Sequence, residues 1–497
     1  MKYIKKVMAV GLVVMLLAAC GNGSGTNGDD TQPPSQNGYN EEPPTTLPGD
    51  ELSPYEFTET LMDLDGRLIT FLAVDARNHW DYDFEDIDRT PNETLRVMEI
   101  LREIERDYNT SIEIYWHIPS GLQQLLVQNR IAGEAPFDLF ETNLSDFMVN
   151  NIWAAGVVMP VTHPAIVDVI MPHDNPWRAS EFTTFGENDT QFAVHFKPFN
   201  TPTILRDVLI FNETLRAQFG LPVFYDMVRN GEWTWNTFDN ILSEIVSASN
   251  GTVFPIAYWH ESGVIPVFVA SNNGTIVDRT PDGLRFVGDT NDNALEAMNF
   301  IRTIAERDFF HPMSPRHQHF STEHFGGILA RGEALFAFGE YATMKNLTRQ
   351  AIGYENDFTF GILPPPIGPR GTNFVGVISS DMLYHVMYGI ERPEEAAAVL
   401  VAIANRTGQR TYRMIDHERR YSLQSEASAE MLEILLNNIV IDVSRIHGSS
   451  RSAGAQGLVG AGLRILRLEQ TPVQSMQEIA PLAQVWFDEL NALGASY

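Results

Sequence analysis

Short apolar runs alternate with amphipathic segments along this chain, and that order restricts the folds it can adopt. The first segments are strand-like at 66–74, helix-like at 90–109, strand-like at 111–118, helix-like at 121–133 and strand-like at 137–140. Within the first helical segment, Val97, Leu101 and Ile104 recur at the spacing of one helix face. Alternating strands and helices are typical of a parallel sheet with right-handed crossovers, so the sequence predicts an α/β fold.

A second α/β series begins near residue 206. Its strand-like runs are 206–212, 252–259, 333–341, 358–366 and 374–379, and its helix-like segments are 234–249, 291–308 and 392–405. With Thr234 as N-cap, Trp233 and Phe238 take the two positions of a hydrophobic staple. We therefore expect Trp233 and Trp235 to pack in the core and not to bind a ligand. Two such series in one long chain indicate two lobes or more.

The only cysteine of the chain, Cys20, follows a basic start and an apolar run from Val7 to Ala19. These features are typical of a secretory signal, and the run is shorter than the roughly 20 residues of a transmembrane helix. The residues Leu17-Ala18-Ala19-Cys20 resemble the lipobox of bacterial lipoproteins, in which the cysteine is acylated. We expect a signal peptide at 1–19 and a lipid anchor on Cys20. The alternative is an ordinary signal peptide with an incidental cysteine.

Residues 20–65 are polar, rich in Gly and Pro, and nearly free of aliphatic side chains. Such a segment buries too little apolar surface to offset the entropy of ordering it, so we expect a flexible tether. Its G-x-G-x-x-G at 23–28 has no strand before it and no helix after it, which excludes a dinucleotide fingerprint. The protein is therefore expected outside the cell membrane, on its extracellular or periplasmic face.

Composition excludes several function classes. The formal net charge is −30, and loss of the three lysines of the signal, which has no acidic residue, makes it −33. Such a surface repels nucleic acid and anionic lipid. The sequence has no Gly-Lys dipeptide and therefore no P-loop, and it has no H-E-x-x-H or G-x-S-x-G motif. A glycosidase with two carboxylates stays open, because 64 acidic residues are present.

Six pieces of the chain, in this order, carry a resemblance to a known family. They are VLIFNETL, GEWTWNTFDNIL, EALFAFGEY, FGILPPP, FVGVIS and RPEEAAAVL. Over roughly residues 68–490 they resemble the extracellular solute-binding proteins of carbohydrate ABC transporters, the maltose-binding-like family. The stretch 406–452 departs from the match. The resemblance implies a type II periplasmic-binding-protein fold, with two α/β lobes, a hinge and a ligand cleft between the lobes.

We expect the first lobe to contain 66–205 and 340–395, and the second to contain 206–339 and 396–497. Ligands of open α/β sheets bind beyond the carboxyl ends of the strands. In the first lobe, polar and aromatic side chains follow two such ends. They are Trp80 and Asp81 after the first strand, and Glu141 and Asn143 after the run 137–140.

In the second lobe, Trp259, His260 and Glu261 lie at the end of the strand-like run 252–259. The resemblance implies that they contact the ligand, because the maltose-binding-like family has an acidic and an aromatic residue on its sugar at this place. The resemblance adds Glu340 and Tyr341, where that family has a stacking aromatic. A pyranose offers a C–H face to an aromatic ring and hydroxyls to carboxylates or amides. The alternative for these positions is that the aromatics are core residues and the acids are solvated.

Four histidines lie within 311–324: His311, His317, His319 and His324. None of the usual zinc spacings is met, so we expect a solvated loop, with a metal site as the alternative. The sequence therefore predicts a lipid-anchored, monomeric receptor without enzymatic activity or a cofactor. It would bind a sugar or oligosaccharide and deliver it to an ABC permease. A carbohydrate hydrolase and a peptide- or metal-binding receptor are the alternatives.

Overall fold

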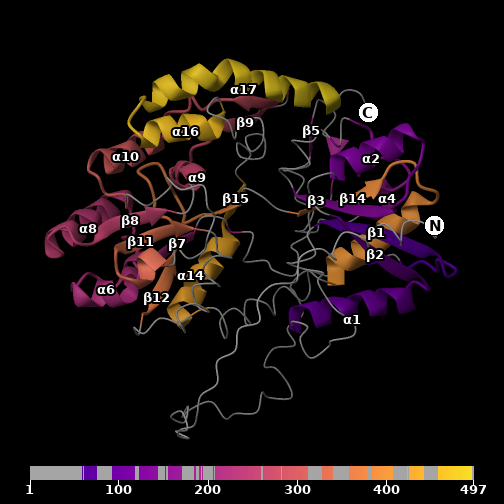
Figure 1. The fold of residues 1–497 in the computed structure, drawn as a ribbon, viewed down its shortest axis with the longest axis horizontal. Helices are drawn as coiled ribbons and strands as arrows, with labels where there is room; N and C mark the ends of the chain where they lie inside the picture. Colours follow the sequence, from indigo (N-terminus) through magenta and orange to yellow (C-terminus); the bar gives the residue numbers. More distant parts are fainter. Residues whose placement is uncertain are drawn as a thin grey trace, which may run out of the picture. The chain divides into compact units, whose positions relative to one another are not determined.

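The computed structural model describes residues between 59 and 494, with gaps. They are 59, 61–74, 92–117, 122–143, 152, 155–170, 184–185, 190–191, 193, 205, 208–258, 261–280, 282–311, 327–339, 358–378, 382–406, 423, 425–441 and 457–494 (Figure 1). The chain divides into two units, 1–52 and 53–497, and all described residues belong to the second. The signal peptide, Cys20 and most of the predicted tether lie outside the described residues.

The first sheet has the strand order β2-β1-β3-β14-β4. Its strands are β1 (Leu68–Val74), β2 (Ser111–His117), β3 (Leu139–Asn143), β4 (Val158–Met159) and β14 (Met382–Met387). The helices of this part of the chain are α1 (Asn92–Asp107), α2 (Leu122–Ile131) and α4 (Val167–Ile170). As predicted, β1 runs parallel to both β2 and β3, whereas β14 is antiparallel to β3 and β4.

A helix over 393–406 packs against this first sheet and not against the second, where we expected everything after residue 395. All residues from Ala396 to Ala404 are buried, in one cluster with Ile69 and Phe71 of β1. A helix that is apolar on every side must be surrounded by core. Arg67 fixes the start of this helix, because its guanidinium bonds Glu395 at 2.8 Å and also Asp138. The helix therefore belongs to the first lobe.

The folded chain also begins earlier than the predicted tether boundary at residue 65. Leu64 is buried, and its backbone N–H donates to the Tyr108 carbonyl at 2.9 Å. Before it, Glu59 accepts hydrogen bonds from Arg406, which also donates to Asp107 at 2.9 Å. This ion cluster joins the segment before β1 to the ends of α1 and of helix 393–406.

The second sheet has the order β12-β7-β11-β8. Its strands are β7 (Val208–Asn212), β8 (Phe254–Tyr258), β11 (Ala334–Gly339) and β12 (Phe360–Leu363). Strand β7 is antiparallel to both of its neighbours, and β11 is parallel to β8. We expected 358–366 in the first lobe with the rest of 340–395, but β12 lies here. All five residues of β7 are buried, so both of its edges need backbone partners, and β12 supplies the outer one.

Five helices precede or follow strands of this second sheet in the chain. They are α6 (Glu213–Gln218), α7 (Phe224–Arg229), α8 (Trp235–Ala248), α9 (Glu261–Ser271) and α10 (Asp292–Glu306). Thr234 caps α8 in a capping box, as predicted. The Trp233 ring lies edge-on to Phe238 at 5.6 Å between centroids, and Trp235 stacks on Phe300 at 4.5 Å. Both tryptophans are buried core residues, which confirms their structural role.

The remaining elements are two-stranded ladders and C-terminal helices. They are β5 (Thr184–Phe185) with β6 (Thr190–Gln191), β9 (Val277–Thr280) with β10 (Gly283–Phe286), β13 (Gly376–Ile378) with β15 (Ile439–Ile441), α14 (Glu426–Asn437), α16 (Leu458–Leu466) and α17 (Pro472–Gly494). Figure 1 shows α16 beside α17, and the two helices contact each other, α10 and, through α17, β10. Along the chain, β13 lies in the segment that leads from β12 of the second sheet to β14 of the first.

Candidate functional site

The carboxyl ends of β1 and β3 lie at one edge of the first sheet, because the two strands are parallel and Phe71 pairs with Leu139. Trp80 and Asp81, which we expected beyond β1, lie outside the described residues. Glu141 and Asn143 belong to β3 itself, opposite Tyr384 and Met382 of β14. The Glu141 side chain is 0% exposed. A carboxylate held in the core is costly unless it is paired or hydrogen-bonded.

A buried histidine that we did not predict lies next to these residues. His385 of β14 is 1% exposed, and its Nε2 lies 2.9 Å from the Thr142 hydroxyl oxygen. Its ring stacks on Phe140, with centroids 4.7 Å apart. The strand pair β3–β14 therefore has polar groups on both faces at this edge, with Thr142 and His385 on one and Glu141 on the other. In the sequence, His385 is a single histidine within MLYHVM, a run that otherwise resembles an ordinary core strand, so nothing marked it as part of a polar cluster.

The second sheet brings two of its carboxyl ends together in the same way. Strands β8 and β11 are parallel, and their last registered pair is Tyr258 with Phe338. Trp259 and His260 follow β8 and lie outside the described residues, as do Glu340 and Tyr341 after β11. Glu261 is the first residue of α9. The two predicted groups, 259–261 after β8 and 340–341 after β11, therefore follow strand ends at the same edge of this sheet.

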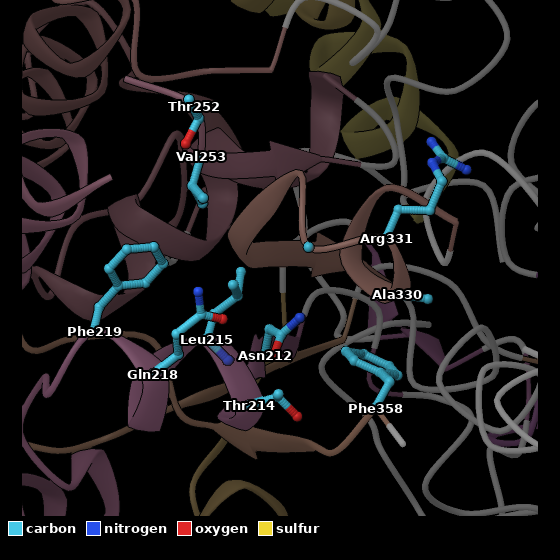
Figure 2. A pocket seen from close by; sticks show the side chains of 11 residues that line it. Asn212, Thr214, Leu215, Gln218, Phe219, Thr252, Val253, Ala330, Arg331 and Phe358 are labelled. Carbon is cyan, nitrogen blue, oxygen red and sulfur yellow. Dashed lines mark hydrogen bonds between the residues drawn. The ribbon is translucent and has the colours of Figure 1, made fainter. Parts of the chain in front are cut away.

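A pocket of about 400 Å³ lies at the opposite edge of the second sheet, where we predicted no site (Figure 2). It is formed where β7 ends and where β8, β11 and β12 begin. The lining residues are Asn212, Thr214, Leu215, Gln218, Phe219, Thr252, Val253, Ala330, Arg331, Gly332 and Phe358. They come from four separate segments of the chain, so no continuous motif marks the pocket in the sequence.

Of the four clustered histidines, only His311 is among the described residues, and it is not solvated as expected. Its side chain is 7% exposed and lies edge-on to Phe254, with ring centroids 4.9 Å apart. Burial lowers the pKa of His311, although Glu333, with a carboxylate oxygen 3.5 Å from Nε2, acts in the opposite direction. Among the described residues no group of three His, Cys, Asp or Glu side chains is arranged to hold a metal ion.

Solved structures of other proteins share this architecture. The sugar-binding protein MalE from Xanthomonas citri matches with a TM-score of 0.58 and 12% identity, over 86% of this chain and 98% of that one. The GacH receptor of Streptomyces glaucescens matches with a TM-score of 0.54 and 12% identity, over 85% and 99%. The chain has the maltose-binding-protein fold. A cyclic α-maltosyl-1,6-maltose binding protein from Arthrobacter globiformis agrees, with a TM-score of 0.53, 12% identity, and coverage of 86% and 99%.

The maltose-binding-protein fold is the two-lobe α/β architecture that the sequence resemblance implied, and these comparisons confirm that prediction. At the level of sequence, no protein-family model and no curated protein matches the chain. In the part of the chain that the structure describes, none of the helices has the length and hydropathy needed to cross a membrane.

Proposed function

We propose that this protein is the substrate-binding component of an ABC importer and captures a sugar or an oligosaccharide outside the cell. The observation that carries the proposal is the fold, which is shared almost end to end with proteins that bind such ligands. The GacH receptor was solved with acarbose, and a cyclo/maltodextrin-binding protein with a TM-score of 0.54 and 13% identity was solved with maltotetraose. These structures are of binding proteins, which favours binding without catalysis.

We assign the ligand site to a cleft between the two lobes, where the carboxyl edges of the two sheets would face each other. From the first lobe it would use Trp80, Asp81 and Asn143, and from the second Trp259, His260, Glu261, Glu340 and Tyr341. Glu141, which is 0% exposed, would reach a ligand only if binding rearranged this edge of the sheet. The placement of β1 with β3, and of β8 with β11, supports this assignment, because each pair of parallel strands ends at one edge. Aromatic rings would pack on the C–H faces of the sugar while the polar groups bond its hydroxyls.

Calorimetry with mono- and oligosaccharides tests the proposal. A ligand found in that screen should bind Trp80→Ala and Trp259→Ala more weakly by about 2 kcal/mol or more, the range of an interface hot spot. Glu261→Gln should weaken binding less than Glu261→Ala, because it keeps an acceptor oxygen for a hydroxyl. The sugar assignment fails if both tryptophan variants bind as the wild type does, or if the ligand is a metal ion or a peptide.

Capture would proceed by closure of the lobes about a hinge, with no covalent step. Strand β13, which pairs with β15, lies in the segment that connects β12 of the second sheet to β14 of the first, which makes it a candidate hinge element. The alternative function is that of a glycosidase that uses a pair of carboxylates. Incubation with the bound oligosaccharide distinguishes the two, because a hydrolase releases reducing ends whereas a receptor returns the ligand unchanged.

We further propose that acylated Cys20 anchors the protein as a monomer to the outer face of the cell membrane, beside its permease. The support is the lipobox-like Leu17-Ala18-Ala19-Cys20 after a short apolar run. Cys20→Ser should abolish acyl labelling and leave the protein unprocessed or released into the medium. Persistent acyl labelling of that variant would refute the anchor.

A further inference from the structure

The pocket at the starts of β8, β11 and β12 is separate from the proposed ligand site. The proposed residues follow the other ends of β8 and β11. A strand rises about 3.3 Å per residue, so the five residues of β8 place the two ends roughly 15 Å apart. A volume of about 400 Å³ lies in the range of small-molecule sites, roughly 300–1,000 Å³.

The pocket has an apolar floor and one accessible aromatic wall. Leu215, Val253 and Phe358 are buried, each less than 8% exposed. The Phe219 ring is half-buried at the end of α6. Figure 2 shows Phe219 and Phe358 on opposite sides, with Leu215 between them. Such a floor favours a ligand with a nonpolar face.

Charge does not favour an ionic ligand. Arg331 is the one charged side chain among the described lining residues, and it bonds both carboxylate oxygens of Glu333, at 2.6 and 3.0 Å. These bonds lower the pKa of Glu333, so the pair stays ionised and mutually compensated near neutral pH. In Figure 2 the Arg331 guanidinium is turned away from Leu215 and Asn212. The pocket therefore offers neither an uncompensated cation nor an uncompensated anion.

Uncharged hydrogen-bonding groups occupy the rim. Thr214, Gln218 and Thr252 are exposed there. The Thr252 hydroxyl donates to the Ser249 carbonyl and so retains acceptor capacity. The Thr214 hydroxyl oxygen accepts from the Thr359 backbone N–H and shares a further bond with the Thr359 hydroxyl, which leaves it one donor or one acceptor for a ligand. No described residue hydrogen-bonds the Gln218 carboxamide, which leaves its donors and its acceptor for a ligand. This set matches a molecule with several hydroxyl groups.

We propose that this pocket is a second binding site, for a neutral polyhydroxylated molecule such as a mono- or disaccharide, with Phe219 contacting its C–H face and Gln218 its hydroxyls. The site is independent of the proposed capture site in the other part of the lobe. It would take such a ligand whether or not the cleft is occupied.

Methyl NMR of the full-length protein tests the proposal, because Leu215 and Val253 carry methyl groups in the pocket wall. Titration with glucose or maltose should shift these methyl signals and saturate. Gln218→Ala should weaken the titration about fivefold, the effect of one neutral hydrogen bond. Phe219→Leu should weaken it as well, because it keeps apolar volume but removes the ring. Gln128→Ala is the matched control, an exposed helical glutamine on α2, and should leave the titration unchanged.

Four outcomes overturn the proposal. The Leu215 and Val253 methyl signals could stay fixed with both sugars, respond to glucose 6-phosphate but not to glucose, respond only to phenol, or titrate identically in Gln218→Ala and wild type. Binding in the cleft moves other methyl signals with its own affinity, and Gln218→Ala leaves those unchanged. Failure of the capture site and failure of this pocket are therefore separate observations.

Discussion

At the scale of single residues, Trp233, just before α8, and Trp235, its first residue, differ in the hydrogen-bond acceptor that loses its donor when each is substituted. Trp233 donates from Nε1 to the buried Pro364 carbonyl at 2.9 Å. Trp235 donates to the Ser271 hydroxyl, which itself donates to the Phe268 carbonyl. Trp233→Phe leaves the buried Pro364 carbonyl without a hydrogen-bond donor and should lower the free energy of unfolding by about 1–3 kcal/mol.

Trp235→Phe serves as the comparison, because it leaves no backbone carbonyl without a donor and keeps a ring against Phe300. It should cost less than Trp233→Phe, because both variants lose the volume of one fused ring and only Trp233→Phe also leaves a buried carbonyl without its donor. Urea titrations of the two variants measure the difference. Equal losses would show that ring volume, and not the hydrogen bond to Pro364, sets the stability at Trp233.

His311 should make stability depend on pH. Burial lowers the pKa of His311 below its ordinary value of 6.5, so below that pH the unfolded chain binds a proton that the folded chain does not. The contribution of His311 is therefore complete above pH 6.5 and is lost as the pH falls toward the folded-state pKa. His311→Phe removes this loss and can keep the edge-on contact with Phe254.

The measurement is the difference in unfolding free energy between wild type and His311→Phe across that range. The difference should be constant at pH 7 and above, and should move in favour of His311→Phe as the medium becomes acidic. Because the two curves share every other carboxylate, the subtraction isolates the histidine together with its contact to Glu333. A difference that stays constant throughout would contradict the buried neutral state.

At the scale of elements, the ladder of β13 and β15 depends on the absence of a side chain at Gly376. A Cβ there would lie 2.6 Å from the Leu435 carbonyl oxygen and 2.9 Å from a Leu205 methyl carbon. The backbone oxygen cannot turn aside as a flexible side chain would. Gly376→Ala should therefore destabilise the protein by about 1–3 kcal/mol, the cost of overpacking.

Gly462 in α16 is the matched glycine for this experiment. A Cβ there would meet only the Ile265 methyl end at 3.1 Å, which can give way, and alanine favours a helix by about 1 kcal/mol over glycine. Thermal unfolding should show Gly462→Ala at or above wild type and Gly376→Ala below it. If Gly376→Ala proved as stable as Gly462→Ala, the close packing of β13 on α14 would be refuted.

Local patterns predicted the elements better than their partners. The segments that became β1, β2, α8 and α10 were predicted because periodicity and capping are written in adjacent residues. Which sheet β12 joins depends on pairing with β7, far away in the chain. Which sheet helix 393–406 covers depends on packing against β1, which is also distant in sequence. The Thr142–His385 contact and the pocket arise the same way, from segments brought together only by folding.

At the scale of the whole molecule, the proposed function requires a change in shape. Two lobes that close on a sugar should reduce the radius of gyration, which small-angle scattering measures with and without a saturating ligand from the calorimetric screen. Occupation of the pocket at the starts of β8, β11 and β12 alone should not have this effect. An unchanged radius with the cleft ligand would argue against closure.

The ion cluster at Glu59 has a consequence for shedding. Arg406 donates to the Glu59 carboxylate at 2.8 Å, which joins the segment before β1 to the folded unit. A protease that cuts before Glu59 leaves this ion pair and β1 in the released fragment. With the proposed anchor and capture site, the released fragment should therefore keep the ligand affinity of the anchored protein. Outside the cell, it would compete with that protein for the same nutrient.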